Sequence, residues 1–462
     1  MISTVMQVAR RLASGETTSA ALVDEALERA TNPAGEGARV FMALHGDSAR
    51  ALARASDLAR AHGVVASPLA GVPVSVKDLF DIAGDVTRAG SKVLEQTPPA
   101  ALDSVVVARL RAAGAIIVGR TGMTEFAYSG IGYNPHYGTP RNPWQRDVEF
   151  THGENRARGR IPGGSSSGAA VSVTDGMAVV GIGTDTGGSV RIPASLCGIT
   201  GFKPTARRVS REGVYPLSGT LDSIGPLAAS VQCCAIVDAI LAGEPIRPLA
   251  SRSVRGLRLG VVRDLLTDNL DEPTTVAFER ALSALSAAGA LVQVVPFEDL
   301  RRLPQINRHG GFSGAEALAL HRARLATDAG RYDQRVARRI LAAGAMNAAD
   351  YVDMMAERAA MIERFEQLAG SLDALLAPTV ARVAPPIAEI EYDDDRFLAA
   401  NGLILRNTAA FNFLDACALS LPCHRAGEAP VGLMVAAQAL SDARLLGIGA
   451  ALEAVLTGVR AA

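Results

Sequence analysis

The chain has 462 residues, which is long enough for one large α/β domain or for two to three average domains. Its 46 Lys and Arg residues nearly balance its 47 Asp and Glu residues, so the formal net charge is −1 and no global field would attract nucleic acid or an anionic membrane. Polar or charged residues interrupt the most apolar stretches well before 18 positions, which argues against a transmembrane helix.

The N-terminus and the cysteines favour a cytoplasmic protein. Arg10 and Arg11 follow the apolar residues of the N-terminal segment instead of preceding them, which argues against a secretory signal. No Cys-x-x-Cys pair occurs, and a bond between adjacent Cys233 and Cys234 would be awkward, so we expect free thiols in a reducing compartment. The five cysteines are Cys197, Cys233, Cys234, Cys417 and Cys423. The seven histidines show no His-x-x-x-His spacing, and we expect neither a metal nor another cofactor.

Two amphipathic helices are predicted at the start of the chain, over residues 3–14 and 19–31, with Thr18 or Ser19 capping the second. From residue 69 onward, short apolar runs alternate with helical periodicity, which indicates an α/β protein with a layered sheet. The segments of this alternation are 72–76, 104–114, 115–119, 177–183, 257–262, a long helix over 274–289, 291–295, 373–378, 416–422 and 431–437.

No Gly/Ser linker, low-complexity run or repeat separates these segments, so the sequence predicts a single domain over residues 1–462 with a sheet built from both halves. Within it we expect N-terminal helices in 1–65, a core in 69–230 and a variable helical flank in 300–400.

Two segments depart from the alternation. Residues 145–160 carry many charges and little apolar periodicity, which predicts an exposed loop. Residues 313–370 are helical in pattern and poor in strands, which predicts a lid or flank over a cleft. A solvated surface insertion without influence on the substrate is the alternative for both segments.

The segment with the richest chemistry spans residues 161–205 and holds two Gly-Gly-Ser turns. Ser165 ends the first turn and Ser189 ends the second, with an apolar, strand-like run between them. Glycines before a serine permit backbone conformations that suit a hydroxyl aimed at a bound carbonyl. Backbone N–H groups in the second turn could converge on a developing oxyanion.

Other hypotheses fit these glycines less well. A dinucleotide-binding fingerprint would need glycine where Thr186 stands, and no phosphate-binding Gly-Lys-Ser/Thr loop occurs. Residues 164–168 match the nucleophile-elbow pattern, which would make Ser166 the nucleophile of an α/β-hydrolase. That fold needs a later histidine, and the candidates by chain order are His309, His321 and His424. A structural Gly/Ser loop without chemistry is the remaining alternative.

Lys77 ends the apolar run in GVPVSVKD, where its ammonium would be partly desolvated. Desolvation lowers the pKa of a lysine from about 10.4 toward neutrality and allows it to accept a proton. The alternative for the Lys77–Asp78 dipeptide is an ordinary ion pair at the surface.

The segments GVPVSVKD, PGGSSSGAA and GTDTGGSVRIPA, in this order, resemble the amidase signature family. The resemblance extends through CGITGFKPT and LDSIGPLA, and more loosely to APVGLMVAA near the C-terminus, so it covers most of residues 69–230. It implies the amidase signature fold, an α/β domain whose mixed, twisted central sheet is covered by helices on both faces. The interval between the lysine and the first serine turn is longer than the family pattern, with the surplus in 145–160.

The resemblance also implies roles for the triad. Lys77 is then the general base, Ser189 the nucleophile, and Ser165 a bridging serine held by a cis peptide bond. The interval of 24 residues between Ser165 and Ser189 fits the family pattern, which favours Ser165 over Ser166 or Ser167.

Further residues follow from these roles. Asp185 and Arg191 flank the nucleophile turn and are expected to pair and brace it. The expected oxyanion hole consists of Thr186, Gly187, Gly188 and Ser189. Substrate-binding candidates outside the motifs are Phe126, Tyr128, Tyr133 and Gly163, together with parts of 313–400.

Three functional classes remain. The first is a free-standing hydrolase, as monomer or homodimer, of the C–N bond in small amides or carbamates (urethanes), with esters as further substrates. The second is the glutaminase subunit of a complex that transamidates charged transfer RNA, and the third is a catalytically silent relative. The presence of all three triad residues favours an active enzyme.

Overall fold

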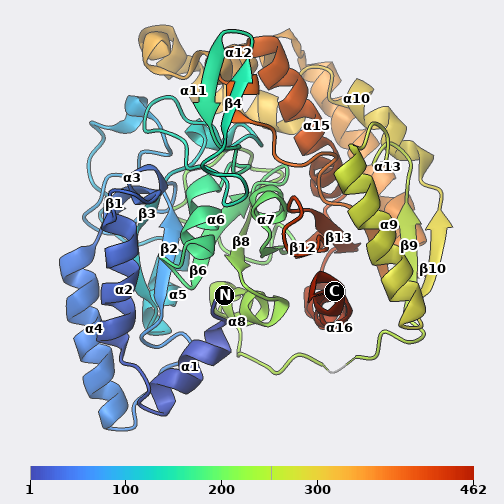
Figure 1. The fold of residues 1–462 in the computed structure, drawn as a ribbon. Coiled ribbons are helices and arrows are strands. Elements are labelled where there is room, and N and C mark those ends of the chain that lie inside the picture. Colours follow the sequence, from blue (N-terminus) through green and yellow to red (C-terminus); the bar gives the residue numbers. More distant parts are fainter. Residues whose placement is uncertain (1, 251, 462) are drawn as a thin grey trace.

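A mixed sheet of 11 strands runs through the computed structural model, which describes residues 2–250 and 252–461 (Figure 1). The order of its strands is β1-β3-β2-β6-β8-β7-β12-β13-β11-β9-β10, so strands from both halves of the chain share one sheet. The strands of this sheet are β1 (Phe41–Leu44), β2 (Pro73–Lys77), β3 (Ile116–Thr121), β6 (Val180–Asp185), β7 (Thr200–Lys203), β8 (Ser223–Ala228), β9 (Arg258–Val262), β10 (Leu291–Val295), β11 (Ala374–Pro378), β12 (Cys417–Pro422) and β13 (Gly432–Ala437). Neighbours β3-β2-β6 and β11-β9-β10 are parallel, and the other neighbours are antiparallel.

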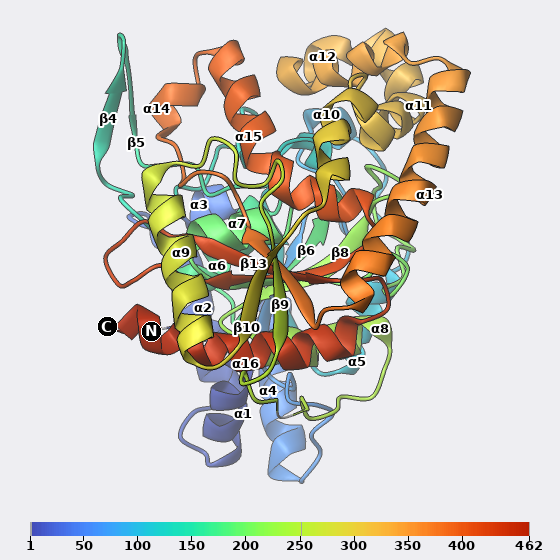
Figure 2. The ribbon, with the colours of Figure 1, turned by 90° about the vertical axis from the view of Figure 1, so that its right-hand side faces the viewer.

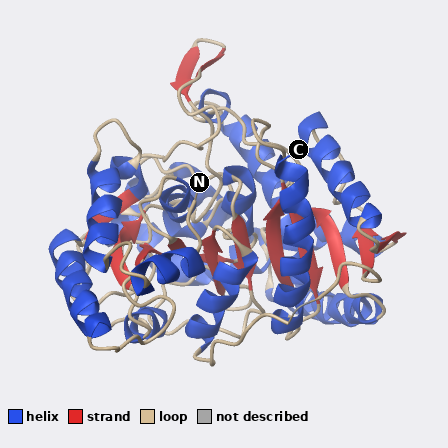
Figure 3. Ribbon diagram, turned by 60° about the horizontal axis from the view of Figure 1, so that its bottom comes forward, coloured by secondary structure: helices blue, strands red, loops and turns tan. Residues whose placement is uncertain are grey.

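Helices cover both faces of the sheet, which confirms the predicted α/β architecture (Figure 3). Helices α5, α8, α9 and α16 pack into the hydrophobic core on one face, whereas α2, α6, α7, α13 and α15 pack into cores on the other. The helices are α1 (Val5–Ala13), α2 (Ser19–Thr31), α3 (Gly37–Val40), α4 (Gly46–Ala61), α5 (Val105–Ala112), α6 (Ser167–Thr174), α7 (Arg191–Cys197), α8 (Val231–Ala242), α9 (Glu272–Ala287), α10 (Leu303–Ile306), α11 (Gly311–Asp328), α12 (Gln334–Ala342), α13 (Ala348–Gly370), α14 (Ile387–Ile390), α15 (Asp394–Phe413) and α16 (Asp442–Ala461). None of the helices in the described part of the chain has the length and apolarity that a membrane span requires.

The two-residue period of strand β2 directs Lys77 to a particular face. Val74 and Val76 lie in the core that α5 and α8 share. The intervening Ser75 points the other way, with its Oγ 2.8 Å from the Oγ of Ser172 in α6. Because side chains alternate along a strand, Lys77 shares the face of Ser75, on the side of α6.

The predicted N-terminal helices are present as α1 and α2, and Thr18 caps the second. Its hydroxyl accepts a hydrogen bond of 3.1 Å from the amide of Ala21. Segment 313–370 is helical as predicted and forms α11, α12 and α13, which gather on one side of the sheet with α10 (Figure 2).

The predicted exposed loop at 145–160 is wrong in part, because it contains an antiparallel hairpin of β4 (Glu149–His152) and β5 (Asn155–Arg158). The hairpin contacts α14, and the Arg160 guanidinium lies over the rings of Trp144 and Phe150 at 4.3 and 4.6 Å. Few apolar residues alternate along these strands, so the sequence carries little of the usual strand signal.

Candidate active site

Sheet topology brings the three triad candidates to one edge of the sheet. Strands β2 and β6 are parallel neighbours, so their carboxyl ends lie side by side. Lys77 ends β2, and the turn that carries Ser189 follows β6. Ser165 precedes α6, which packs against both strands.

Of the three consecutive serines, only Ser165 is hydrogen-bonded to Lys77 among the described residues. The Nζ of Lys77 donates hydrogen bonds of 2.8 Å to the Oγ of Ser165 and to Oγ1 of Thr184. The hydroxyls of Ser166 and Ser167 instead donate to backbone carbonyls, at 3.3 and 3.4 Å. These hydrogen bonds therefore favour Ser165 as the partner of Lys77. The peptide bond between Gly164 and Ser165 is cis.

The alternative of a surface pair between Lys77 and Asp78 is wrong, because both side chains are fully buried. Asp78 pairs with Arg120, whose Nε lies 2.9 Å from its Oδ1. Burial lowers the pKa of Lys77 from 10.5 to about 7, against the opposing attraction of Asp222 and Asp185. A substantial fraction of Lys77 is therefore neutral near pH 7.

The turn of residues 186–189 is held from two sides. The Thr186 hydroxyl donates to Asp222 at 2.5 Å, and the Thr408 hydroxyl donates to the Gly187 carbonyl at 2.7 Å. Gly188 has a φ of +133°, and a Cβ there would lie 2.1 Å from Oγ1 of Thr408, so only glycine fits. Within residues 2–250 and 252–461, the amides of these four turn residues donate to no acceptor. Unused amides beside a nucleophile are the donors that an oxyanion requires.

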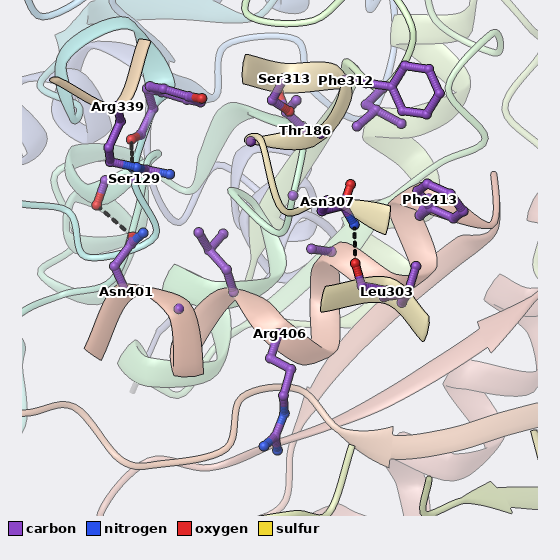
Figure 4. Close-up of a pocket in the computed structure, with 18 of the residues that line it drawn as sticks. Ser129, Thr186, Leu303, Asn307, Phe312, Ser313, Arg339, Asn401, Arg406 and Phe413 are labelled. Atoms are coloured by element: carbon purple, nitrogen blue, oxygen red, sulfur yellow. Dashed lines mark hydrogen bonds between the residues drawn. The ribbon is translucent and has the colours of Figure 1, made fainter. Parts of the chain in front are cut away.

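A cavity of about 550 Å³ opens beside this turn, and Thr186, Gly187 and Ser189 form part of its wall. Helices α10, α11, α12 and α15 supply most of the remaining lining, which is largely apolar (Figure 4). Ser189 is 3% exposed, so the hydroxyl of the candidate nucleophile is reached through this cavity.

Comparison with known proteins decides the family. The family model described as Amidase matches residues 21–446. The chain belongs to the amidase family. It is 35% identical over 457 residues to the 2-amino-5-chloromuconic acid deaminase of Comamonas testosteroni, in a match that covers 97% of this chain and 95% of the relative. It is 34% identical over 492 residues to a subunit of the glutamyl-tRNA(Gln) amidotransferase of Roseiflexus castenholzii, covering 98% and 95%.

A crystal structure described as an amidase matches this chain with a TM-score of 0.86 and 34% sequence identity, covering 98% of this chain and 99% of the other. These similarities confirm the predicted family and fold. The amidase is therefore a hydrolase of carbon–nitrogen bonds.

The substrate-binding candidates of this amidase occupy different places. Tyr128 lines the cavity. Phe126 packs its ring against an aromatic cluster that includes His321 at 4.3 Å, and Tyr133 lies edge-on to Phe397 at 6.3 Å. Gly163 lies close to Ile192, and neither it nor Phe126 nor Tyr133 is among the residues that line the cavity.

Asp185 and Arg191 form the expected pair, and both side chains are fully buried. Two nitrogens of Arg191 donate to the carboxylate at 2.9 and 3.0 Å, and Asn412 of α15 hydrogen-bonds both partners. Burial alone would raise the pKa of Asp185, but Arg191, with smaller contributions from Lys203 and Asn412, holds it at about 2. The carboxylate also accepts the amides of Val190 and Arg191, so this pair ties the nucleophile turn to α7 and α15.

Replacing Arg191 by methionine should lower the free energy of unfolding by about 3–5 kcal/mol, because the Asp185 carboxylate would stay buried without its partner. Equilibrium denaturation in urea at pH 7 measures the loss. Arg11→Met is the matched control, since its ion pair with Glu16 is exposed and should contribute less than about 1 kcal/mol. Equal losses in the two variants would contradict a bracing role for Arg191.

Several residues around the triad were not predicted from the sequence. Thr184 contacts Lys77, and Asp222 holds Thr186. Asn401, Thr408 and Asn412 reach the site from α15, where their spacing of seven and four residues places them on one helix face. The signal that the sequence offered was the helical spacing of these polar residues; their burial is evident only in the structure. Among the described residues, no group of three or more His, Cys, Asp or Glu side chains is arranged to hold a metal ion.

Proposed function

We propose that this amidase cleaves the C–N bond of a small amide or carbamate through an acyl-enzyme on Ser189, with Ser165 and Lys77 as its proton relay. The observation that carries the proposal is the 2.8 Å hydrogen bond from Lys77 Nζ to Ser165 Oγ, made by a buried lysine whose pKa is lowered to about 7. The peptide amide of Ser166 also donates to the Ser189 carbonyl at 3.3 Å, so the two serine segments adjoin.

The chemistry begins with neutral Lys77. It accepts the proton of Ser165 as Ser165 accepts that of Ser189, and the Ser189 oxygen attacks the substrate carbonyl. The amides of residues 186–189 stabilise the resulting oxyanion. The proton then returns through Ser165 to the departing nitrogen, the C–N bond breaks, and an amine leaves. Water attacks the acyl-enzyme in a second round and restores Ser189.

The glutaminase subunit of a transfer-RNA-dependent complex is the second candidate, because the amidotransferase subunit of Roseiflexus castenholzii is 34% identical to this chain. The lining of the cavity argues against a glutaminase, because it contains no aspartate or glutamate in the described part of the chain. The ammonium of glutamine would have no carboxylate partner there. We therefore favour a hydrolase that acts without a partner subunit. We place it in the cytoplasm, where its five free, buried thiols would stay reduced.

Covalent labelling combined with a substrate panel tests the proposal. A fluorophosphonate should add once per chain, and peptide mass spectrometry should place the adduct on Ser189. The purified chain alone should hydrolyse aryl amides, aliphatic amides or carbamates faster than glutamine. An adduct on Ser166 would favour the nucleophile-elbow hypothesis instead, and activity only with glutamine and a co-purified partner would favour the glutaminase.

A further inference from the structure

The charges in the lining of the substrate cavity are all of one sign. Its residues include two arginines, Arg339 and Arg406, and no acidic residue within the described part of the chain. A guanidinium in a largely apolar cavity is costly unless hydrogen-bonding partners or an anion compensate it. The two arginines differ in how far the protein itself supplies these partners.

Each of the three guanidinium nitrogens of Arg406 donates a hydrogen bond within the protein. Its Nε donates to Asn407 at 2.9 Å, and its two terminal nitrogens donate to the carbonyl of Asp268 and, at 3.0 Å, to that of Leu266. Figure 4 shows its side chain turned away from the other labelled residues. Arg406 therefore has a structural role in joining α15 to the loop after β9.

Arg339 of α12 makes fewer hydrogen bonds with the described residues than Arg406 does. Among the residues that the structure describes, its side chain makes one hydrogen bond, from Nη1 to the Tyr128 carbonyl, and forms no ion pair. Its guanidinium lies 4.4 Å from the centre of the Tyr128 ring. Asp333, the acid that attracts it, accepts the amide of Arg335 as the cap of α12. Nε and Nη2 of Arg339 thus keep unused donors.

Two polar neighbours extend this end of the cavity. Figure 4 shows Ser129 and Asn401 on the same side as Arg339. The Oδ1 of Asn401 accepts hydrogen bonds from the Ser129 hydroxyl at 3.0 Å and from the Gly130 amide at 2.8 Å. The acceptor of Asn401 is therefore occupied, and its Nδ2 is left as a donor.

We infer that the substrate of this amidase carries a carboxylate at the end remote from its scissile bond, bound by Arg339 with Asn401 beside it. This inference rests on the proposed function and adds the charge of the substrate. A guanidinium offers two parallel N–H groups that match a carboxylate, and the apolar walls would hold the chain between the carboxylate and the amide carbonyl. Because no acid lines the cavity in the described part of the chain, a dicarboxylic acid monoamide fits better than an α-amino acid amide.

A matched pair of substrates tests the inference. An ω-carboxyacyl p-nitroanilide carries the anion, and an n-alkanoyl p-nitroanilide of equal length lacks it. The wild type should have the larger kcat/KM for the anionic member. Arg339→Met should lower kcat/KM for the anionic substrate roughly 10–100-fold. The loss in kcat/KM for the neutral substrate should be at least tenfold smaller. Arg339→Lys should recover part of the loss for the anionic substrate.

Arg338→Met is the control, since Arg338 neighbours Arg339 on α12 but is 65% exposed and pairs with Asp394. It should keep the wild-type preference. Equal losses for both substrates in Arg339→Met, or a wild type that prefers the neutral substrate, would overturn the inference. Both outcomes leave the proposed function intact. The proposed function itself would fail if Ser189→Ala still hydrolysed both substrates.

Discussion

Replacing Ser189 by alanine is expected to lower kcat by roughly 10⁴–10⁶-fold, the range seen when a serine hydrolase loses its nucleophile. The variant keeps the amides of the 186–189 turn and the cavity, so substrate should still bind. Its fold should also be retained, because no side-chain hydrogen bond of Ser189 to another described residue is broken. Steady-state hydrolysis of an aryl amide measures the loss, and thermal denaturation checks the fold.

Ser195→Ala provides the matched control for this experiment. Ser195 lies in α7, just beyond the nucleophile turn, and is fully buried, and its Oγ has no hydrogen-bond partner within the described residues. Its replacement should change kcat less than about threefold, in line with an interior hydroxyl that takes no part in the reaction. Wild-type turnover by Ser189→Ala would remove Ser189 from the mechanism, and a comparable loss in Ser195→Ala would mean that packing around α7 controls the rate.

The strands of the fold were predictable where they form continuous apolar runs. Segment 431–437 differs by a single residue from β13, which is buried on both faces. Segment 291–295 coincides with β10, an edge strand that keeps an apolar run although Leu291 and Val294 are exposed. Strand β1, Phe41–Leu44, was not predicted, because it is short and directly follows a helix. Local pattern also failed at 149–158, where packing against α14 and not apolar alternation stabilises the hairpin.

The candidate site was predictable only in the part that short motifs encode. Lys77 and Ser189 stand in recognisable segments, and spacing favoured Ser165 among three serines. Arg339 lies within 313–400, parts of which were expected to bind substrate, but neither it nor Asn401 could be singled out, because both reach the cavity only through the packing of α12 and α15. Nothing near either residue in the sequence resembles a binding motif, so the charge of the cavity emerges only in three dimensions.

The pH dependence of the wild type follows from the buried lysine. If neutral Lys77 is the base, kcat/KM should rise with pH through an apparent pKa of about 7 and then level off. Lys77→Met should lose this rise together with roughly 10³–10⁵-fold of the rate. A wild-type rate that keeps rising toward pH 10.5, the ordinary pKa of lysine, would contradict a neutral base.

Lys77→Met should have a larger free energy of unfolding than the wild type, although it loses activity. The pKa of Lys77 is lower in the folded protein than in the unfolded chain, so between pH 7 and 10.5 the unfolded state binds more protons and stability rises with pH. At pH 7 most of the cost of burying the amine is still present, and Lys77→Met should therefore raise the free energy of unfolding by roughly 2–4 kcal/mol. This gain should shrink as the pH approaches 10. Lys92→Met is the control at an exposed lysine and should change the free energy of unfolding at pH 7 by less than about 0.5 kcal/mol. A Lys77→Met protein less stable than wild type at pH 7 would mean that the hydrogen bonds of Lys77 to Ser165 and Thr184 outweigh its desolvation.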